Sequence, residues 1–589
     1  MDYDSLTSLP AMFFANTAEI GDRPFLWAKR DGDWRPTTGS NARNQAAALT
    51  NALISLGVSK GDRVTLVAES RPEWMIADIA IMATGGIAVP AYTTNQVSDH
   101  VHVLRDSGAK GAIVSGPALA KNLLPAAVEA GLDFIVAMEP LTEAPDGIAI
   151  HLWDDVIAAH GGDAPDASGV ARTDTSCLIY TSGTGGVPKG VMLSHGAIIS
   201  NCKGAYDLLL NLGLDDEKFL SFLPLSHSYE HTAGLMFPLS IKAQIYYAEG
   251  VDKLAANMEE VSPTIMTAVP RLYETMHGRI VRGVQQKGGL SEKLFMKAVE
   301  TGRKKYEGKR LGLGEALLDP LLTKLVRKKV AGRFGGRLKA MVSGGAPLNY
   351  DIGTFFKALD VPLLQGYGQT ESAPIISCNL PHRNKIHTVG PKFVDVDLKI
   401  AEDGEILVKG ELVMQGYWNM PDATAEAITD GWLHTGDIGE IDEDGYLMIT
   451  DRKKDIIVNS GGDNIAPQRI EGFLTLQPEI AQAMVYGDRK PHLVALIVPD
   501  PDFMADWAKA NGKPKDVAAL AEDEDFRSAI AAAIDRVNED LSVIERVRRF
   551  IVVAEAFSIE NEMMTPSMKI RRHVIKDRYG DALEALYVR

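Results

Sequence analysis

The chain carries the run Tyr180-Thr181-Ser182-Gly183-Thr184-Gly185-Gly186-Val187-Pro188-Lys189-Gly190, directly after the apolar stretch Cys177-Leu178-Ile179. The apolar stretch predicts a buried strand that opens into hydroxyl residues, glycines and one lysine. Glycines let backbone N–H groups approach an anion, hydroxyls donate further hydrogen bonds, and Lys189 adds a positive charge. Because no Gly-Lys-Ser/Thr ends the run, it differs from a Walker loop and predicts a nucleotide-phosphate loop of another kind. A flexible glycine-rich turn is the alternative interpretation.

Length and composition indicate a globular protein with at least two domains. The chain has 589 residues, 46% of them hydrophobic and 24% charged, and one core stops growing well below this length. Its three cysteines have no metal-binding spacing, which favours a reducing compartment and argues against disulfides. The acidic N-terminus has no secretory signal, and a net charge of −17 argues against general nucleic-acid binding. We therefore expect a cytoplasmic protein with no nucleic-acid partner.

Helix-like and strand-like segments alternate through the first half of the chain. This alternation predicts a layered α/β architecture with mainly parallel strands. Farther along, Asp403-Gly404 and Asp444-Gly445 are turn signals between short strand-like runs, which predict a small antiparallel β subdomain at about 395–450. The expected helices span 44–56, 72–84 and 98–106, and the expected strands span 62–68, 87–90 and 112–115.

Four further motifs follow the glycine-rich loop, and the ordered set resembles the adenylate-forming superfamily of acyl-CoA synthetases, peptide-synthetase adenylation domains and luciferases. The resemblance runs from about Trp27 to about Arg572. One departure is visible, because the family usually has Thr-Thr-Gly where this chain has Thr184-Gly185-Gly186. The four motifs are Gln365-Gly366-Tyr367-Gly368-Gln369-Thr370-Glu371, His434-Thr435-Gly436-Asp437, Asp451-Arg452-Lys453-Lys454-Asp455 and Met564-Thr565-Pro566-Ser567-Met568-Lys569-Ile570-Arg571-Arg572.

The resemblance implies the α/β fold of adenylate-forming enzymes. A large N-terminal layered domain, residues 1–451, would bind AMP and the acyl group and would include the β subdomain. A smaller, mobile C-terminal α/β domain, residues 452–589, would carry the catalytic lysine. The resemblance places the hinge between them at Lys454.

The implied reaction joins a carboxylic acid to AMP, releases pyrophosphate and passes the acyl group to a thiol. The attacking carboxylate and the phosphorus it attacks both carry negative charge, so the site must neutralise charge and align the reactants. Lys569 is the expected electrostatic catalyst, against the alternative of a solvated lysine. Glu371 and Thr184 are the expected Mg²⁺ ligands, and Thr370 would donate to the α-phosphate. His227 resembles the family's gate between acyl and nucleotide sites, against the alternative of a structural histidine.

The remaining contacts implied by the resemblance hold the nucleotide and CoA. Asp437 would accept from both ribose hydroxyls, Arg452 would make a second ribose or phosphate contact, and Tyr367 would offer a flat face to adenine. Gly461 resembles the glycine that lets pantetheine pass the backbone. The expected cofactor-binding residues are Thr181, Ser182, Gly183, Thr184, Lys189, Gly344, Gly345, Ala346, Tyr367, Gly368, Asp437, Arg452 and Gly461.

Within the superfamily, the resemblance is strongest to bacterial long-chain acyl-CoA synthetases. Three features support this: Gln369, the stretch Leu223–Glu230, and residues 271–340, which resemble the insertion of long-chain members. We therefore expect a long-chain fatty acid–CoA ligase that uses ATP, Mg²⁺ and CoA. The main alternative is an acyl-AMP ligase that delivers medium-chain or aryl acids to a carrier-protein thiol. An ATP-dependent phosphotransferase and a non-catalytic acyl-carrier scaffold are alternatives from other classes.

Residues 279–339 are strongly basic within an acidic chain. They hold 17 Lys and Arg against five Asp and Glu, a net of +12, with clusters at Arg303-Lys304-Lys305 and Arg327-Lys328-Lys329. Basic residues are attracted to anionic lipid over about a Debye length. The segment therefore predicts peripheral contact with the inner face of the membrane, with a solvated helical face or CoA phosphates as alternatives. The sequence sets no oligomeric state.

Overall fold

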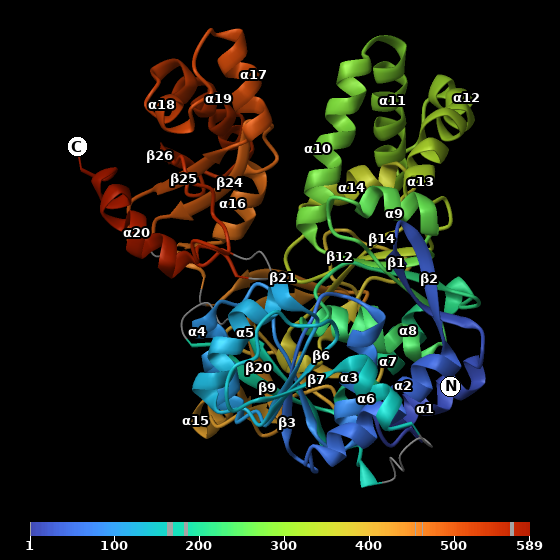
Figure 1. The fold of residues 1–589 in the computed structure, drawn as a ribbon. Coiled ribbons are helices and arrows are strands. Elements are labelled where there is room, and N and C mark those ends of the chain that lie inside the picture. Colours follow the sequence, from blue (N-terminus) through green and yellow to red (C-terminus); the bar gives the residue numbers. More distant parts are fainter. Residues whose placement is uncertain are drawn as a thin grey trace.

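The computed structural model describes residues 2–161, 169–181, 187–453, 455–461, 463–565 and 570–588 (Figure 1). Two eight-stranded sheets form the centre of the N-terminal part, and each is parallel inside with antiparallel strands at an edge. The first sheet consists, in spatial order, of β15 (Ile375–Cys378), β14 (Leu363–Gly368), β13 (Ala340–Ser343), β12 (Ile265–Ala268), β10 (Lys218–Ser221), β11 (Gln244–Tyr247), β1 (Pro24–Arg30) and β2 (Asp33–Thr38).

The second sheet contains the predicted strand of the glycine-rich loop. It consists, in spatial order, of β18 (Gly416–Tyr417), β9 (Lys189–Ser194), β8 (Thr175–Thr181), β4 (Ile87–Pro90), β3 (Arg63–Val67), β5 (Gly111–Val114), β6 (Phe134–Ala137) and β7 (Ala149–Leu152). The predicted layered α/β architecture with mainly parallel strands is confirmed, and the strand expected at 87–90 has these bounds.

Helices pack against both sheets and bury their apolar faces there. The chain enters α2 through Thr38, whose side chain accepts from the Asn41 N–H, and α3 begins at Pro72, where a missing N–H is harmless. The helices expected at 44–56, 72–84 and 98–106 correspond to α2, α3 and α4. The helices of this part are α1 (Leu9–Ile20), α2 (Gly39–Ser55), α3 (Pro72–Ala83), α4 (Val97–Ser107), α5 (Pro117–Ala130), α6 (Trp153–Ala159), α7 (His195–Leu209) and α8 (Phe237–Ser240).

The predicted β subdomain is an antiparallel sheet. Its turns contain Gly404 and Gly445, whose φ angles of +84° and +81° suit glycine. The sheet joins the main core through residues such as Ile406, Val408 and Leu433. Its strands are β16 (Asp397–Ile400), β17 (Glu405–Lys409), β19 (Ile428–Thr429), β20 (Trp432–Ile441) and β21 (Leu447–Arg452), with α15 (Pro421–Ala427) beside them.

A group of helices projects from the first sheet and contains most of the basic segment (Figure 1). Its inner residues, including Phe295, Leu322 and Phe356, form a second hydrophobic core with that sheet. The elements are α9 (Leu254–Val261), α10 (Pro270–Lys287), α11 (Gly289–Tyr306), α12 (Leu313–Leu322), the π-helix η4 (Thr323–Arg327), α13 (Lys328–Arg333) and α14 (Tyr350–Ala358).

Arg327 corrects one expectation about the basic segment, because it does not lie on the surface. Its side chain is only 2% exposed. The guanidinium donates to Asp319 Oδ1 (2.9 Å) and to the carbonyls of Ala298 (2.9 Å) and Ala358 (3.0 Å). Arg327 therefore joins α11, α12 and the end of α14, and only its neighbours Lys328 and Lys329 are exposed.

The C-terminal part is built on a three-stranded sheet that is buried on both faces. In β25, Leu493, Ala495 and Ile497 face a cluster with α16 to α19, whereas Val494 and Leu496 face α20. None of the helices in the described ranges is long and apolar enough to cross a membrane. The elements are β22 (Ile457–Val458), β23 (Asn464–Ile465), α16 (Pro467–Leu474), β24 (Ile480–Tyr486), β25 (Leu493–Pro499), α17 (Pro501–Ala510), α18 (Val517–Ala521), α19 (Glu524–Asp540), β26 (Val547–Val552) and α20 (Arg572–Ala585).

Candidate active site

The glycine-rich loop joins two paired strands of the second sheet. Strand β8 ends at Thr181, which pairs with Lys189 at the start of β9. The predicted phosphate-binding residues Ser182, Gly183 and Thr184 lie outside the described residues. On the described side of the loop, Lys189 Nζ lies 4.6 Å from the centroid of the Tyr417 ring, in the adjacent strand β18. Lys189, on the described side of the loop, therefore lies next to Tyr417.

Three predicted nucleotide-binding residues form one hydrogen-bonded set. Tyr367, on β14, donates its hydroxyl to Asp437 Oδ2 (2.6 Å), and Arg452 Nε donates to Asp437 Oδ1 (3.0 Å). Asp437 and Arg452 are opposite each other on β20 and β21, and Asp437 is buried. Burial and the Asp437 carboxylate raise the pKa of Tyr367 well above its usual value. The Tyr367 phenol therefore stays a donor at neutral pH.

Thr370 and Glu371 lie in η5 (Thr370–Ser372), the short 3-10 helix that follows β14. Thr370 Oγ1 shares a 3.0 Å hydrogen bond with Ser228 Oγ. Glu371 Oε1 accepts from the Tyr417 hydroxyl (2.8 Å). Burial, together with the Glu371 carboxylate, raises the pKa of Tyr417, so this phenol also stays protonated. The two predicted catalytic residues are thus held by partners from distant segments.

The expected gate residue His227 precedes the buried π-helix η3 (Glu230–Met236). The Tyr229 N–H donates to His227 Nδ1 (3.2 Å), which fixes the ring relative to the helix. Glu230 is fully buried, and its two carboxyl oxygens accept from Ser221 (2.6 Å) and Thr267 (2.5 Å) at the ends of β10 and β12. Burial raises the pKa of Glu230 to about 7. Single-turn π-helices are frequent at functional sites.

The glycines expected beside the base follow β13 and end β14. A Cβ on Gly344 would lie 3.0 Å from the Tyr229 ring, and Gly345 has a φ of +82°. Ala346 continues this turn. A Cβ on Gly368 would lie 1.8 Å from the Pro374 carbonyl oxygen, so no other residue fits there. The backbone at both strand ends is therefore shaped for close approach.

Three predicted residues are not joined to this cluster by the described contacts. Lys569 and Lys454 lie outside the described residues. Gly461 is exposed in the C-terminal part, where its N–H donates to Asn459 Oδ1 (2.8 Å). No contact among the described residues links Gly461 to the Tyr367–Asp437–Arg452 set.

Three site residues had no assigned role in the sequence analysis, namely Tyr417, Ser228 and Glu230. Ser228 and Glu230 flank Tyr229 within the stretch Leu223–Glu230. A glutamate at the start of a largely apolar segment could have indicated that Glu230 is buried. Tyr417 carries no such signal, because its partner Glu371 lies 46 positions away.

The described residues fit a nucleotide and Mg²⁺. Each Asp437 oxygen accepts one hydrogen bond and keeps capacity for a ribose hydroxyl. Glu371 is partly exposed and uses Oε1 for Tyr417, while Oε2 has no hydrogen bond within the described ranges. No group of three or more His, Cys, Asp or Glu gathers there. A single carboxylate completed by phosphate oxygens and water is a typical Mg²⁺ site.

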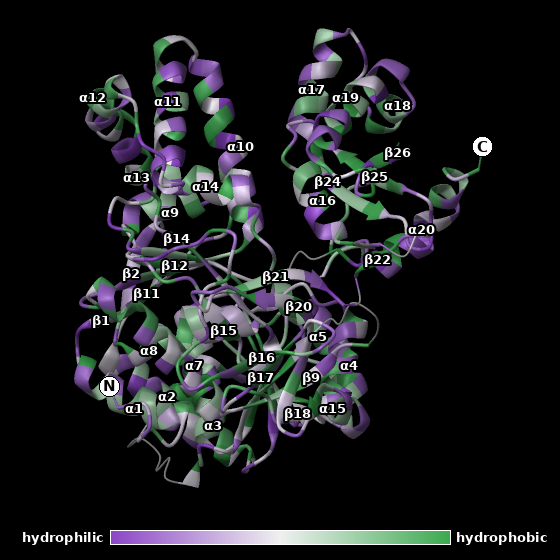
Figure 2. Cartoon of the chain, turned by 180° about the vertical axis from the view of Figure 1, so that it is seen from behind, coloured by the Kyte–Doolittle hydropathy of each residue, from purple (hydrophilic) through white to green (hydrophobic). Residues whose placement is uncertain are grey.

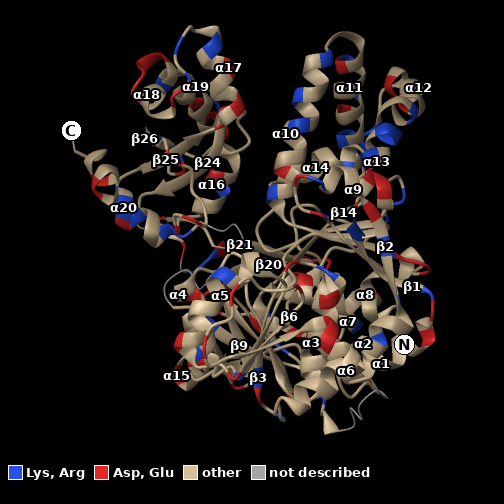
Figure 3. Ribbon diagram, viewed as in Figure 1, with Lys and Arg blue, Asp and Glu red and all other residues tan. Residues whose placement is uncertain are grey.

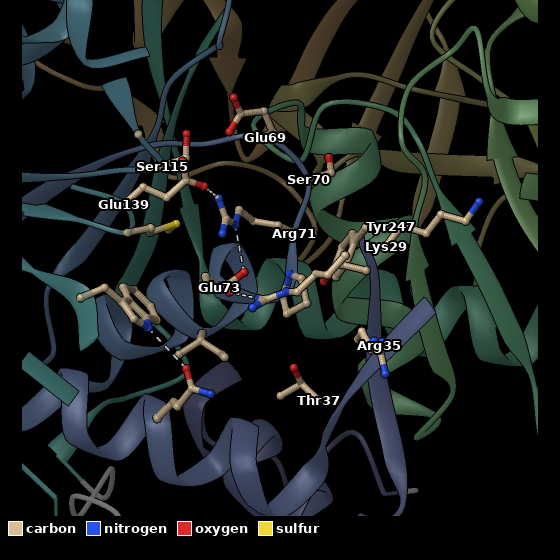
Figure 4. Close-up of a pocket in the computed structure, with 18 of the residues that line it drawn as sticks. Lys29, Arg35, Thr37, Glu69, Ser70, Arg71, Glu73, Ser115, Glu139 and Tyr247 are labelled. Carbon is tan, nitrogen blue, oxygen red and sulfur yellow. Dashed lines mark hydrogen bonds and ion pairs between the residues drawn. The ribbon is translucent and has the colours of Figure 1, made fainter. Parts of the chain in front are cut away.

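A cavity of about 960 Å³ opens elsewhere, near the ends of β3, β5, β6 and β11 (Figure 4). Arg71 donates to Glu73 (2.9 Å) and Glu139 (2.9 Å) across it, and none of the predicted site residues lines it. Ser70 connects it to the gate stretch by donating to the Leu223 carbonyl (3.2 Å). Ionised walls disfavour an alkyl chain, so we assign no acyl-binding role to this cavity.

Solved structures with the same fold cover nearly the whole chain. The adenylation domain of a carboxylate reductase from Mycobacterium chelonae has a TM-score of 0.79 at 22% identity, covering 99% of this chain and 92% of that one. The anthranilate CoA ligase AuaEII, solved with anthranoyl-AMP, has a TM-score of 0.75 at 21% identity, covering 99% of both chains. These similarities confirm the adenylate-forming enzyme fold.

Relatives of similar length share more of the sequence. Long-chain-fatty-acid–CoA ligase FadD15 of Mycobacterium tuberculosis is 34% identical over 98% of this chain and 97% of its own length. The peroxisomal long chain acyl-CoA synthetase 7 of Arabidopsis thaliana is 31% identical over 94% of this chain and 82% of its own length. The family models for AMP-binding enzymes and for their C-terminal domain match residues 13–418 and 454–589. The chain therefore belongs to the AMP-binding enzyme family.

Proposed function

We propose that this chain is an ATP-dependent, AMP-forming ligase that activates a long-chain fatty acid as acyl-AMP and transfers it to CoA. The observation that carries the proposal is the set Tyr367–Asp437–Arg452, a buried carboxylate with two fixed donors, adjoining Thr370 and Glu371. It occurs in a chain whose full-length relatives are named as long-chain fatty acid–CoA ligases.

In the first half-reaction, the fatty acid carboxylate attacks the α-phosphorus of ATP and pyrophosphate leaves. Mg²⁺ bound with the phosphates neutralises part of their charge. Glu371 would hold the metal, Thr370 would donate to the α-phosphate, and Asp437 with Arg452 would fix the ribose. Lys569 would reach the reacting oxygens as charge builds. The contacts of Glu371 and Thr370 with Tyr417 and Ser228 support this arrangement, because they fix both side chains in advance.

In the second half-reaction, the CoA thiol attacks the acyl carbonyl and AMP leaves. We propose that residues 452–589 turn about Lys454 to admit pantetheine past Gly461. The separate hydrophobic clusters of the C-terminal part support its movement as one body.

The acyl group would enter past His227, whose ring is oriented by the Tyr229 N–H. His227 would act as a positioning residue between the acyl and nucleotide sites. The hydroxyls of Ser221 and Thr267 donate to the buried Glu230 carboxyl group. These hydrogen bonds support the role of His227, because they fix the start of η3 directly after it.

The proposal includes a cytoplasmic location with peripheral contact at an anionic membrane through residues 279–339. The exposed basic residues of this segment support the contact, whereas buried Arg327 does not contribute to it. A fatty acid of long chain length partitions into lipid, so contact would shorten its path to the enzyme.

Pyrophosphate release and hydroxamate trapping, measured over saturated acids of increasing length with and without CoA, test the function. We expect Mg²⁺-dependent pyrophosphate release that is greatest for long acids, and thioester only when CoA is present. ADP as product would instead indicate a phosphotransferase. Transfer to a phosphopantetheinyl carrier protein but not to CoA would indicate the acyl-AMP ligase alternative.

A further inference from the structure

We propose that the outer face of α12 and η4 docks on an anionic lipid surface by inserting leucines and pairing lysines with headgroups. We define the α12 face as Leu313, Leu317, Leu321 and Leu325 with Lys324 and Lys328. The proposal rests on the proposed function, because a long-chain fatty acid ligase meets its substrate in lipid. It narrows the proposed membrane contact within residues 279–339 to one amphipathic helix face.

The leucines of the α12 face are unusually exposed for a folded protein. Leu313 is 90% exposed, Leu317 84%, Leu321 46% and Leu325 37%. They recur every fourth residue, which places them along one side of a helix. The opposite side holds the helix to the protein through Leu322, which is fully buried. The helix is thus anchored on one side and presents a contiguous apolar stripe on the other, which marks an interaction surface.

The lysines of the α12 face make no ion pair with acidic side chains among the described residues of the protein. Lys324 and Lys328, and the neighbouring Lys329, are exposed and make no ion pair among the described residues. The acidic residues of α12 are occupied elsewhere, since Glu315 pairs with Lys297 and Lys304 (2.8 and 2.6 Å) and Asp319 pairs with Arg327. The acidic groups of this helix are therefore paired with cations of the protein, whereas Lys324, Lys328 and Lys329 remain exposed; Figure 3 shows the charged residues of this region.

Geometry leaves this face accessible. Helices α10 and α11 project away from the sheets, and α12 lies beside α11 on the side away from the C-terminal part (Figures 1 and 2). The nucleotide-binding cluster lies at the ends of β14 and β21 and in the middle of β20, on the body of the protein. A flat surface could contact the α12 face without blocking the cluster.

The chemistry favours anionic lipid over other occupants. Leucines beside lysines on one helix face match both layers of a membrane interface, the acyl boundary and the charged headgroups. CoA phosphates would engage the lysines but give the leucines no partner. A second copy would cover the leucines but bring like-charged lysines together. An anionic lipid surface satisfies both groups at once.

Vesicle sedimentation tests the proposal with the full-length protein. The probes are vesicles of phosphatidylcholine alone and of phosphatidylcholine with phosphatidylglycerol, at low and high salt. We expect binding to the anionic vesicles only. The variant L313S/L317S should bind them about ten-fold or more weakly, and K324S/K328S/K329S should bind weakly with little salt dependence.

Matched control variants distinguish an effect of the α12 face from a general loss of exposed apolar surface or of positive charge. V543S alters a 67% exposed apolar residue in the C-terminal part, and K121S/K253S/K515S removes three exposed lysines elsewhere with the same change in net charge. Both controls should sediment like the wild type. If L313S/L317S and the α12 lysine variant also bind anionic vesicles like the wild type, the proposal is wrong. If L313S/L317S changes only the mass measured by analytical ultracentrifugation, the face is a self-association surface and the proposal is again wrong.

An activity measurement distinguishes this proposal from the proposed function. With detergent-dispersed fatty acid, the α12 variants should match the wild type. With fatty acid supplied in anionic vesicles, they should be slower. Vesicle binding by a wild type that makes no acyl-CoA under any condition would contradict the proposed function and leave the docking surface standing.

Discussion

The Tyr417 hydroxyl donates a 2.8 Å hydrogen bond to Oε1 of Glu371, while Lys189 Nζ lies 4.6 Å from the centroid of the same tyrosine ring. One side chain thus contacts both the lysine that ends the glycine-rich loop and the carboxylate proposed to bind Mg²⁺. Because outer partners orient metal ligands, Tyr417 is placed to set the direction of Glu371.

Replacing Tyr417 with Phe keeps the ring for Lys189 and removes only the hydrogen bond to Glu371. We expect the Mg²⁺ concentration for half-maximal pyrophosphate release to rise about ten-fold, with kcat at saturating Mg²⁺ little changed. Tyr486→Phe removes a similar tyrosine–carboxylate bond, to Glu584, in the C-terminal part and is the control. An unchanged Mg²⁺ dependence in Tyr417→Phe would show that Glu371 does not need this partner.

Asp437→Ala should weaken ATP binding by about 10- to 100-fold, because it removes a buried, charged hydrogen-bond acceptor. Isothermal titration with a non-hydrolysable ATP analogue measures this directly. Tyr367→Phe, which removes one of the two donors to Asp437, should weaken binding less. Equal affinities in wild type and Asp437→Ala would remove Asp437 from the nucleotide site.

Glu230 gives a pH-dependent prediction. Burial raises its pKa from 4.5 to about 7 in the folded protein. Between these values the unfolded chain loses the proton while the folded protein keeps it, so folding stability falls as pH rises through this window. Above about pH 7 both states are ionised and the loss is complete, on the order of 3 kcal/mol.

Glu230→Gln imitates the protonated acid and should lack this loss. Thermal unfolding midpoints of the wild type and the variant should therefore diverge between pH 5 and pH 8, with the variant relatively more stable at the higher pH. A difference that does not change with pH would mean that Glu230 is ionised throughout.

Lys569→Ala should abolish acyl-AMP formation and leave ATP binding largely intact. The lysine charge matters most in the transition state, so its loss reduces turnover by about 10²-fold or more rather than affinity. Supplied with synthetic acyl-AMP and CoA, the variant should still form thioester. Pyrophosphate release at the wild-type rate would refute the assignment.

Lys454→Pro should retain acyl-AMP formation and lose most thioester formation. Proline fixes φ near −65° and removes the rotation that a hinge requires. Single-turnover assays of each half-reaction measure the two effects separately. Equal loss of both would indicate misfolding or a hinge at another residue.

Much of the layered core was predictable because its signals are local. The strand at Ile87–Pro90 is a short apolar run bounded by Gly85-Gly86, and α3 begins at a proline. The resemblance also named Tyr367, Asp437 and Arg452, and the structure brings these three together. Each of these residues stands in a short, contiguous motif, so the sequence around it was enough to identify it.

The remaining contacts depend on pairings between distant segments. Tyr417 meets Glu371 only because β18 extends the second sheet beside β9, and no pattern near Tyr417 shows that. Arg327 was misplaced because charge runs usually lie on the surface. The buried Arg327 is paired with Asp319 and with the carbonyls of Ala298 and Ala358. These partners lie on other helices, so the sequence near Arg327 does not reveal them.

The sheet of the C-terminal part, covered on both faces, has a consequence for the energetics of catalysis. Its two clusters draw their members from the C-terminal part itself, so the proposed reorientation would leave that interior intact. Toward α10, the part is held by Arg282 with Asp500 (3.4 Å) and by Arg271 with the Ala481 carbonyl (3.3 Å). Solvent-accessible ion pairs of this kind contribute about 1 kcal/mol or less. The rotation proposed for residues 452–589 would therefore break these polar contacts at a small cost in free energy, while the interior of the C-terminal part stayed intact.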